Sequence, residues 1–239
     1  ILQWIRDLDT SEVTSMNGTF REFINFNEPL NIWNVSKVTD MDSMFYKAYG
    51  NPYDNGFNQP LNSWNVNRVE NMSWMFYRGI FNQPLDNWDV TAVTDMGYMF
   101  HRASNFNQYL GNWNVSGVTN MSNMFQYASN FNQPLNSWNV RGVNNMGGMF
   151  YSATNFNRPL NTWDVSEVNS MDVMFSEATS FNQPLNSWNV RGVTRMIGMF
   201  HTATKFNEDI SNWDVTDVTD MNRMFRNAYA FNQQLNSWN

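Results

Sequence analysis

The chain has 239 residues and a formal net charge of −7. It contains no cysteine, which excludes disulfides, thiolate catalysis and cysteine metal sites. The acidic balance argues against nucleic acid as a partner and against an anionic membrane surface, because both reward basic patches. No apolar run approaches the ~18 residues of a membrane span, so membrane insertion is not expected.

A unit of 25 residues repeats along most of the chain, and residues 131–155 (FNQPLNSWNVRGVNNMGGMFYSATN) are a clear copy of it. With Phe131 as position 1, the unit starts again at Phe26, Phe57, Phe81, Phe106, Phe156, Phe181, Phe206 and Phe231. Every Met lies at position 16 or 19, and 18 of the 19 Phe lie at position 1 or 20. A sustained period of this length indicates a repeat architecture, so residues 26–239 are expected to form one continuous array.

Residues 1–25 form a degenerate first unit. Val13, Met16 and Phe20 keep the register, but Leu8 stands where Trp belongs and the segment carries more charge than its neighbours. Terminal repeats of this kind usually cover the end of a core, so we expect an N-terminal capping repeat.

The second unit is longer than the others by six residues, within the segment 50–56 (GNPYDNG). Gly, Pro, Asn and Asp are turn formers, which predicts a loop inserted outside the stack of units.

Within each unit the apolar positions predict one strand and one helix. Trp138 and Val140 alternate with polar residues, as in a short strand with one buried face. Met146, Met149, Phe150 and Ala153 fall at i, i+3, i+4 and i+7, which is one face of a short helix. One short strand and one short helix per coil predict a right-handed α/β repeat solenoid.

Two columns of identical residues are expected along such a solenoid. The nine Trp from Trp33 to Trp238 at position 8 should lie in the core rather than stack on sugars. Asn occupies position 2 in every copy from Asn27 to Asn232, which favours a ladder of buried amides serving the backbone of neighbouring coils.

The unit FNQPLNSWNVxxVTxMxxMFxxA resembles the repeat of the BspA-like leucine-rich-repeat surface proteins, in the branch catalogued from mycoplasma lipoproteins. The resemblance covers Phe26 to Asn239. It implies a leucine-rich-repeat-like solenoid at the cell surface or outside the cell, with an adhesive, recognition or structural role. It implies no known reaction and brings no catalytic residues.

The residues themselves also argue against an enzyme. The only histidines, His101 and His201, both fall at position 21, four coils apart, and are expected to be variable surface positions. Phosphate loops and nucleophile elbows are absent from the sequence. We therefore predict no catalytic residues, no cofactor and no metal site.

The outward positions 7 and 9 of the expected strand form a polar stripe. Its candidate binding residues are Asn65, Asp89, Asn114, Asn139, Asp164, Asn189, Asp214, Ser137, Thr162 and Ser187. Such a stripe suits many weak hydrogen bonds to a repetitive polar partner, a glycan or a protein. The alternative is a ladder that serves only the solenoid, and the sequence leaves both open.

Two further kinds of surface site are candidates. Trp74 is off register at position 18 and, with Tyr53, could form a contact patch; otherwise it is an incidental surface aromatic. Five Asn-x-Ser/Thr motifs are candidate N-glycosylation sites, although an Asn-rich repeat also produces them by chance: Asn17, Asn34, Asn71, Asn114 and Asn120.

The leading functional hypothesis is a non-enzymatic extracellular or cell-surface scaffold or filament subunit. Its partners would be other protein chains, including a second copy end to end, because the units are nearly interchangeable. The rival is an adhesin, a module that binds a glycan or a protein through the polar stripe.

Overall fold

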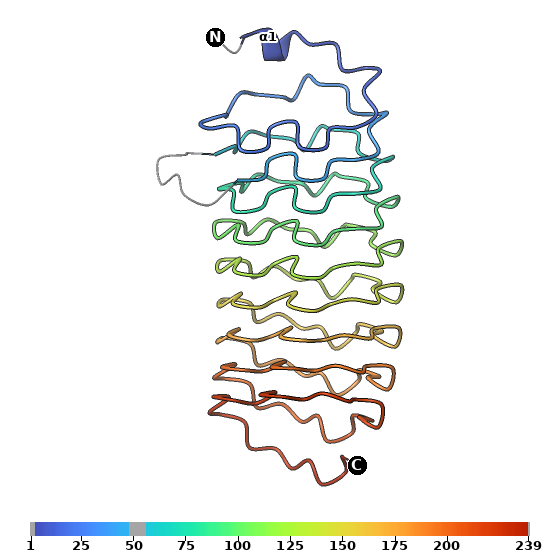
Figure 1. Cartoon of the computed structure of the whole chain (residues 1–239), viewed down its shortest axis with the longest axis vertical. Coiled ribbons are helices and arrows are strands. Elements are labelled where there is room, and N and C mark those ends of the chain that lie inside the picture. The colour runs from blue at the N-terminus through green and yellow to red at the C-terminus, as the bar shows by residue number, and fades with distance from the viewer. Residues whose placement is uncertain (1–2, 48–55, 239) are drawn as a thin grey trace.

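The computed structural model describes residues 3–47 and 56–238. The chain winds in successive coils that stack along one long axis, and the two ends of the chain lie at opposite ends of the stack (Figure 1). Each coil corresponds to one sequence unit. Isolated parallel bridges join position 15 of successive units: Ser15, Asp40, Asn71, Asp95, Asn120, Asn145, Ser170, Arg195 and Asp220.

Backbone hydrogen bonds between coils run through positions 16 to 22. The amides of Gly148, Phe150 and Ser152 donate to carbonyls one position earlier in the following coil, at N···O distances of 2.8, 2.9 and 2.7 Å. The same pattern recurs from coil to coil, with every second amide used. All these bonds run in one direction, from each coil to the following one, and together they fix the 25-residue register of the stack.

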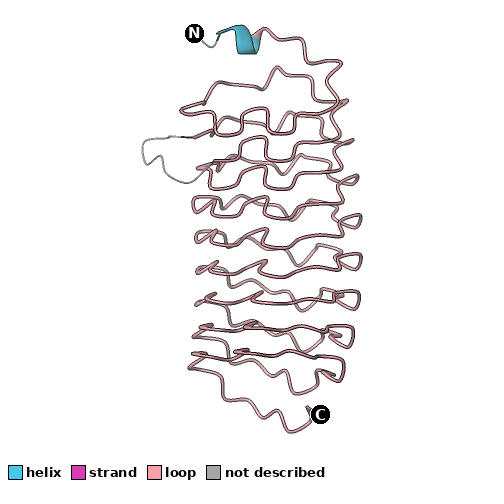
Figure 2. Ribbon diagram, viewed as in Figure 1, coloured by secondary structure: helices cyan, strands magenta, loops and turns pink. Residues whose placement is uncertain are grey.

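The predicted helix at these positions is wrong. Among the described residues the one helix is α1, Gln3–Arg6 (Figure 2). Positions 18 and 22 have positive φ in successive units, for example +63° at Gly148 and +55° at Ser152. A left-handed residue cannot continue a right-handed helix, so the segment becomes a series of tight turns, such as Met149 N–H to Met146 O at 3.2 Å.

The strand expected around Trp138 and Val140 is not present either, and the part of the chain that the structure describes contains isolated bridges but no strand. Turns bracket this segment: the Trp138 amide donates to Leu135 O at 3.1 Å and the Val143 amide to Val140 O at 2.9 Å. The alternation of burial is confirmed, because Trp138 and Val140 are buried and Asn139 is exposed. Membership of the leucine-rich-repeat class and right-handedness stay predictions.

The core consists of columns of identical side chains. Trp138 lies 6.4 Å from the Trp ring on either side, at interplanar angles of 2°, and its indole N–H donates to Leu110 O at 3.0 Å. Phe125 stacks on Phe131 at 3.9 Å and on Phe150 at 5.8 Å. The buried position of the Trp column is thus confirmed from Trp33 to Trp213, while Trp238 is half-buried.

The predicted Asn ladder is also confirmed, although its side chains are half-buried rather than buried. The Oδ1 of Asn132 accepts the amide of Asn157 at 3.0 Å, and Asn107 accepts the amide of Asn132 at 2.9 Å. Gln133 adds a second tie by donating from Nε2 to the carbonyl of Asn107 at 3.1 Å. Position 2 therefore connects each coil to the next.

The first unit joins the same ladder, since the Gly18 amide donates to Asp42 O at 2.8 Å. Its Ile5 is buried and accepts the indole N–H of Trp33 at 2.9 Å. Trp4 and Ile24 nevertheless remain 60% and 59% exposed, so this end of the stack presents apolar surface. The capping role stays a prediction, and residues 50–55 of the predicted loop lie outside the described residues.

Candidate functional site

The polar stripe faces solvent, and each of its position-9 side chains bonds to its own chain. Oδ1 of Asn139 accepts the amide of Arg141 at 3.3 Å, and Oδ1 of Asp164 accepts the amide of Ser166 at 3.1 Å. Equivalent turns form in the other units, at Asn65, Asp89, Asn114, Asn189 and Asp214. This Asx turn accounts for Asn or Asp at position 9, because either side chain supplies the required oxygen.

The position-7 hydroxyls tie each coil to the preceding one. Ser137 donates to Gly111 O at 2.7 Å, Thr162 donates to Asn136 O at 2.8 Å, and Ser187 donates to Asn161 O. The stripe residues are therefore brought together in a continuous row, with hydrogen bonds that serve the stack itself.

Two acidic members of the stripe, Asp164 and Asp214, have a lowered pKa. The hydroxyl and amide of Ser166 hold the pKa of Asp164 below its usual range, and Arg141 contributes the same effect from 3.8 Å. Thr216 and Arg191 lower the pKa of Asp214 in the same way. These ion pairs are well exposed and add little stability.

Trp74 is not an isolated surface aromatic. Its ring is half-buried and stacks on Tyr98, with centroids 3.8 Å apart and an interplanar angle of 5°. Tyr77 lies against the same ring at 5.2 Å. Further contacts extend the group along the stack, giving what we call the aromatic row: Tyr46, Trp74, Tyr77, Tyr98, His101 and Tyr127. Its proposed companion Tyr53 lies outside the described residues.

The aromatic row escaped the sequence reasoning, although its signal was present. Tyr46, Tyr77 and His101 occupy position 21 of successive units, and Trp74 and Tyr98 occupy position 18. A periodic ladder brings the same position of neighbouring coils within contact distance. Aligning the units by position would have predicted these stacks.

The prediction that His101 is a surface position is wrong. Its side chain is 8% exposed, its Nδ1 has no hydrogen-bond partner, and its ring packs 4.9 Å from Tyr77. Burial, with the charge of Arg102, lowers the pKa of His101 to about 4. His201 is half-buried, and its Nδ1 lies 3.4 Å from Ser176 Oγ.

Cationic side chains accompany the aromatic row. The guanidinium of Arg21 lies 4.1 Å from the ring centre of Tyr46, and that of Arg102 lies 4.3 Å from the ring centre of Tyr127. Lys47 donates from Nζ to Phe23 O at 2.9 Å. Guanidinium groups over ring faces are held by the ring quadrupole and keep N–H donors at their edges.

The five glycosylation motifs differ in accessibility. Asn17, Asn34 and Asn114 are exposed, whereas Asn71 and Asn120 are half-buried at bridge positions. The amide Nδ2 of Asn120, the atom a glycan would modify, already donates to Asp95 at 3.0 Å.

No group of three or more acidic or imidazole side chains in the described ranges is placed to hold a metal ion. Nor does any helix within residues 3–47 or 56–238 have the length and apolarity needed to cross a bilayer.

The stacked coils, with the same contacts made at each 25-residue step, define a repeat protein. The family model described as "Mycoplasma protein of unknown function, DUF285" matches residues 1–85, 78–180 and 155–239, and the chain belongs to that family. The mycoplasma-type repeat implied by the resemblance is thereby supported. The narrower kinship with BspA-like proteins stays a prediction. A search of curated proteins returned no match.

Proposed function

We propose that this protein is a non-enzymatic solenoid scaffold, displayed at the cell surface or secreted, in the manner of BspA-like leucine-rich-repeat proteins. The observation that supports it is the uniform bonding between coils. Core columns, amide ladder and Asx turns use the same positions in unit after unit, as in Asn132 with Asn157 and Trp138 with Trp163. Such regularity yields a straight, rigid element in which most of the polar groups bond to neighbouring coils.

The scaffold would act by spacing or joining other protein chains, including further copies of itself. Because one coil's interface is much like the next, a contact between copies can reuse the geometry of contacts between coils. Light scattering and negative-stain microscopy at rising protein concentration test this. Filaments or linear oligomers are expected; a monodisperse rod at all concentrations would sink the filament form of the proposal.

The location has its own test. Protease added to intact cells of the producing organism should cleave the protein if it is displayed outside. Full protection on intact cells, with cleavage after lysis, would contradict surface display.

An adhesin that binds through the polar stripe is the second candidate. It is favoured by the exposure of the stripe at positions 7 and 9 of each unit. Replacing Asn139 and Asp164 by Ala separates the roles. A binding stripe loses its ligand at nearly unchanged stability, whereas the Asx turns predict a loss of stability of about 1 kcal/mol per site.

A further inference from the structure

The aromatic row contains residues that the fold itself does not require. Position 18 has positive φ in each unit and is Gly in three of them, Gly18, Gly148 and Gly198. Trp74 and Tyr98 occupy the same position with φ of 58° and 59°. Bulky residues are strained in this region, where Gly is not. Ser43, Asn123, Val173 and Arg223 share this backbone conformation in other units, so the turn itself does not call for an aromatic side chain at Trp74 or Tyr98.

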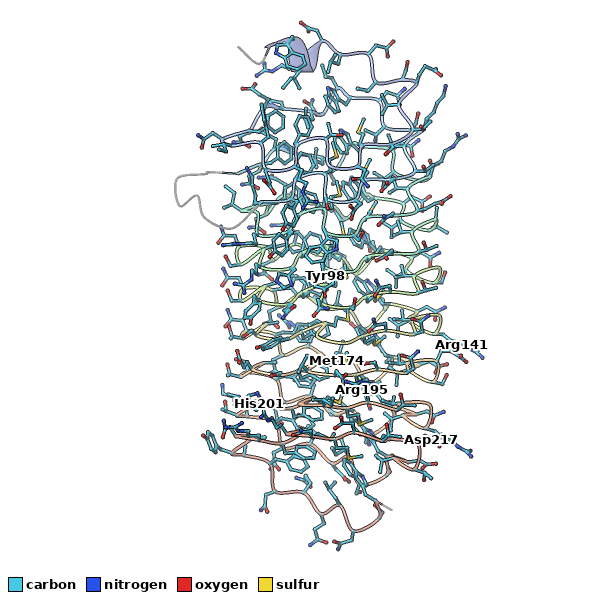
Figure 3. The ribbon with its side chains drawn as sticks, in the orientation of Figure 1. Tyr98, Arg141, Met174, Arg195, His201 and Asp217 are labelled. Atoms are coloured by element: carbon cyan, nitrogen blue, oxygen red, sulfur yellow. The ribbon has the colours of Figure 1, made fainter. Side chains whose placement is uncertain are left out.

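These rings form a surface rather than a core. Trp74, Tyr77 and Tyr98 are each half-buried, in contrast to the fully buried Phe and Trp columns of the interior. Tyr46 stacks on Tyr77 at 4.5 Å, and Trp74 stacks on Tyr98 at 3.8 Å, so the rings of successive coils continue one another. The row therefore runs parallel to the long axis, and its half-buried rings are partly open to solvent although they cover one another's faces where they stack. In Figure 3, Tyr98 lies in the middle of the stack, away from the edge from which Arg141 projects.

The charge along the aromatic row is opposite to that of the whole chain. Position 22 is Lys47, Arg78 and Arg102 in three successive units, while the chain has a net charge of −7. Positions 17, 18, 21 and 22 of the units that start at residues 57, 81, 106 and 131 contain no Asp or Glu. In the unit of Tyr46, position 17 is Asp42, and its carboxylate accepts the hydroxyl of Ser73 at 2.7 Å. The nearby Asp95 carboxylate already accepts the amides of Gly97 and Asn120. A local positive field of this kind selects an anionic partner.

The backbone beneath the aromatic row is fully engaged. The amides of Trp74 and Tyr98 donate to Gly97 O at 3.0 Å and Ser122 O at 2.9 Å, and that of Arg102 donates to Gln126 O at 2.7 Å. An extended peptide gains affinity by adding to an open sheet edge, and these coils offer none. Recognition here must use side chains. The ring surface can contact apolar C–H groups, and the guanidinium groups can donate paired hydrogen bonds to carboxylate or sulfate.

From these observations we propose that the aromatic row with Arg78 and Arg102 binds an anionic polysaccharide, lying along the stack. Rings and cations that recur coil by coil match a polymer of recurring sugar and acid groups, so weak contacts add up along the chain. This surface is separate from the polar stripe, and it would give the scaffold a ligand of its own.

Titration calorimetry with dextran sulfate as the probe tests the proposal, with neutral dextran of equal length as the comparison. Dextran sulfate should bind and neutral dextran should not, and affinity should fall as salt is raised. The double variant R78Q/R102Q should lose about 10-fold or more in affinity. W74S/Y98N, which places side chains found at position 18 of other units, should lose about 10-fold while keeping the fold.

The matched control is R141Q/R191Q, which removes the same charge from the polar stripe. It should change affinity less than about 2-fold, since these arginines pair with carboxylates. Absence of binding to dextran sulfate, an equal loss in the control, or unchanged affinity in W74S/Y98N would each overturn the proposal. So would poly-glutamate that binds as tightly and competes, because it would make the row a site for acidic peptides. If either double variant unfolds, the single variant R102Q is measured instead: reduced affinity for dextran sulfate supports the proposal, and unchanged affinity overturns it.

Discussion

At the scale of single residues, Trp138 shows how one side chain joins three coils. Its ring lies between Trp113 and Trp163, and its indole N–H satisfies the carbonyl of Leu110 in the coil before. A side chain of this size that is 3% exposed carries both an apolar and a polar contribution to stability.

Truncation of Trp138 should therefore be costly. Trp138→Ala is expected to lower the free energy of unfolding by about 3–5 kcal/mol, because it leaves a large cavity. Trp138→Phe keeps a ring but loses the hydrogen bond, and should cost about 1–2 kcal/mol. Urea unfolding followed by circular dichroism measures both. Trp4→Ala, at 60% exposure, is the matched control and should change stability by less than about 0.5 kcal/mol. A cost below about 1 kcal/mol for Trp138→Ala would mean that the Trp column is not core.

A second residue-scale prediction concerns His101 and pH. Burial lowers the pKa of His101 from 6.5 to about 4, so between these values the unfolded chain takes up a proton that the folded chain does not. Stability from this group is fully present above pH 6.5 and is lost as pH falls toward 4, by about 1 kcal/mol at pH 5 after allowance for solvent screening. His101→Gln should flatten this part of the stability–pH curve, and His201→Gln should leave it in place. An unchanged slope in His101→Gln would rule out this residue as the cause.

Sequence reasoning succeeded with residues whose role is repeated and failed with those whose role is local. The buried Trp column and the Asn ladder followed from invariance of positions 8 and 2 within the chain. His101 was mistaken for a surface residue because position 21 varies. Its burial depends on large neighbours, Tyr77 and Tyr127, that only particular units supply.

At the scale of the element, a tight-turn ladder replaces the helix that the sequence predicted. The spacing of Met146, Met149, Phe150 and Ala153 is compatible with either, because all four face the core in both. What decides is position 18, where Gly148 and Gly198 indicate a left-handed backbone. Helix propensity also argued against the first prediction, since Gly147 and Gly148 lie in the middle of the segment.

Gly148 allows this turn to be tested. Its φ is +63°, and a Cβ added there would collide with Oδ1 of Asn123 in the preceding coil. Gly148→Ala should therefore cost about 2 kcal/mol, of which about 1 kcal/mol is backbone strain and the rest is the collision. Adding Asn123→Gly should relieve the collision and leave the strain, recovering about half of the loss. Thermal and urea unfolding of the two variants measure this. A neutral Gly148→Ala would contradict the left-handed turn at this position.

At the scale of the whole molecule, each coil contacts only its neighbours, so stability is a sum of similar coil-to-coil terms. The equivalence of the interfaces is close: Phe125 stacks on Phe131 at 3.9 Å, and Phe150 stacks on Phe156 at 4.0 Å. A complete unit should therefore be removable without changing the nature of any remaining interface.

Deletion of residues 131–155 is the corresponding experiment. It joins Asn130 to Phe156, so that Phe156 takes the place of Phe131 beside Phe125, and the indole of Trp163 reaches the carbonyl that Trp138 used. The variant should fold cooperatively, with a urea m-value lower by about a tenth, because one coil's share of surface is no longer exposed on unfolding. Deletion of residues 131–152 is the control, since it shifts the register by three residues and places Asn157 in the buried slot of Leu135 and Asp172 in that of Phe150. The control should fail to fold; if both deletions were equally stable, the stack would not depend on its 25-residue register.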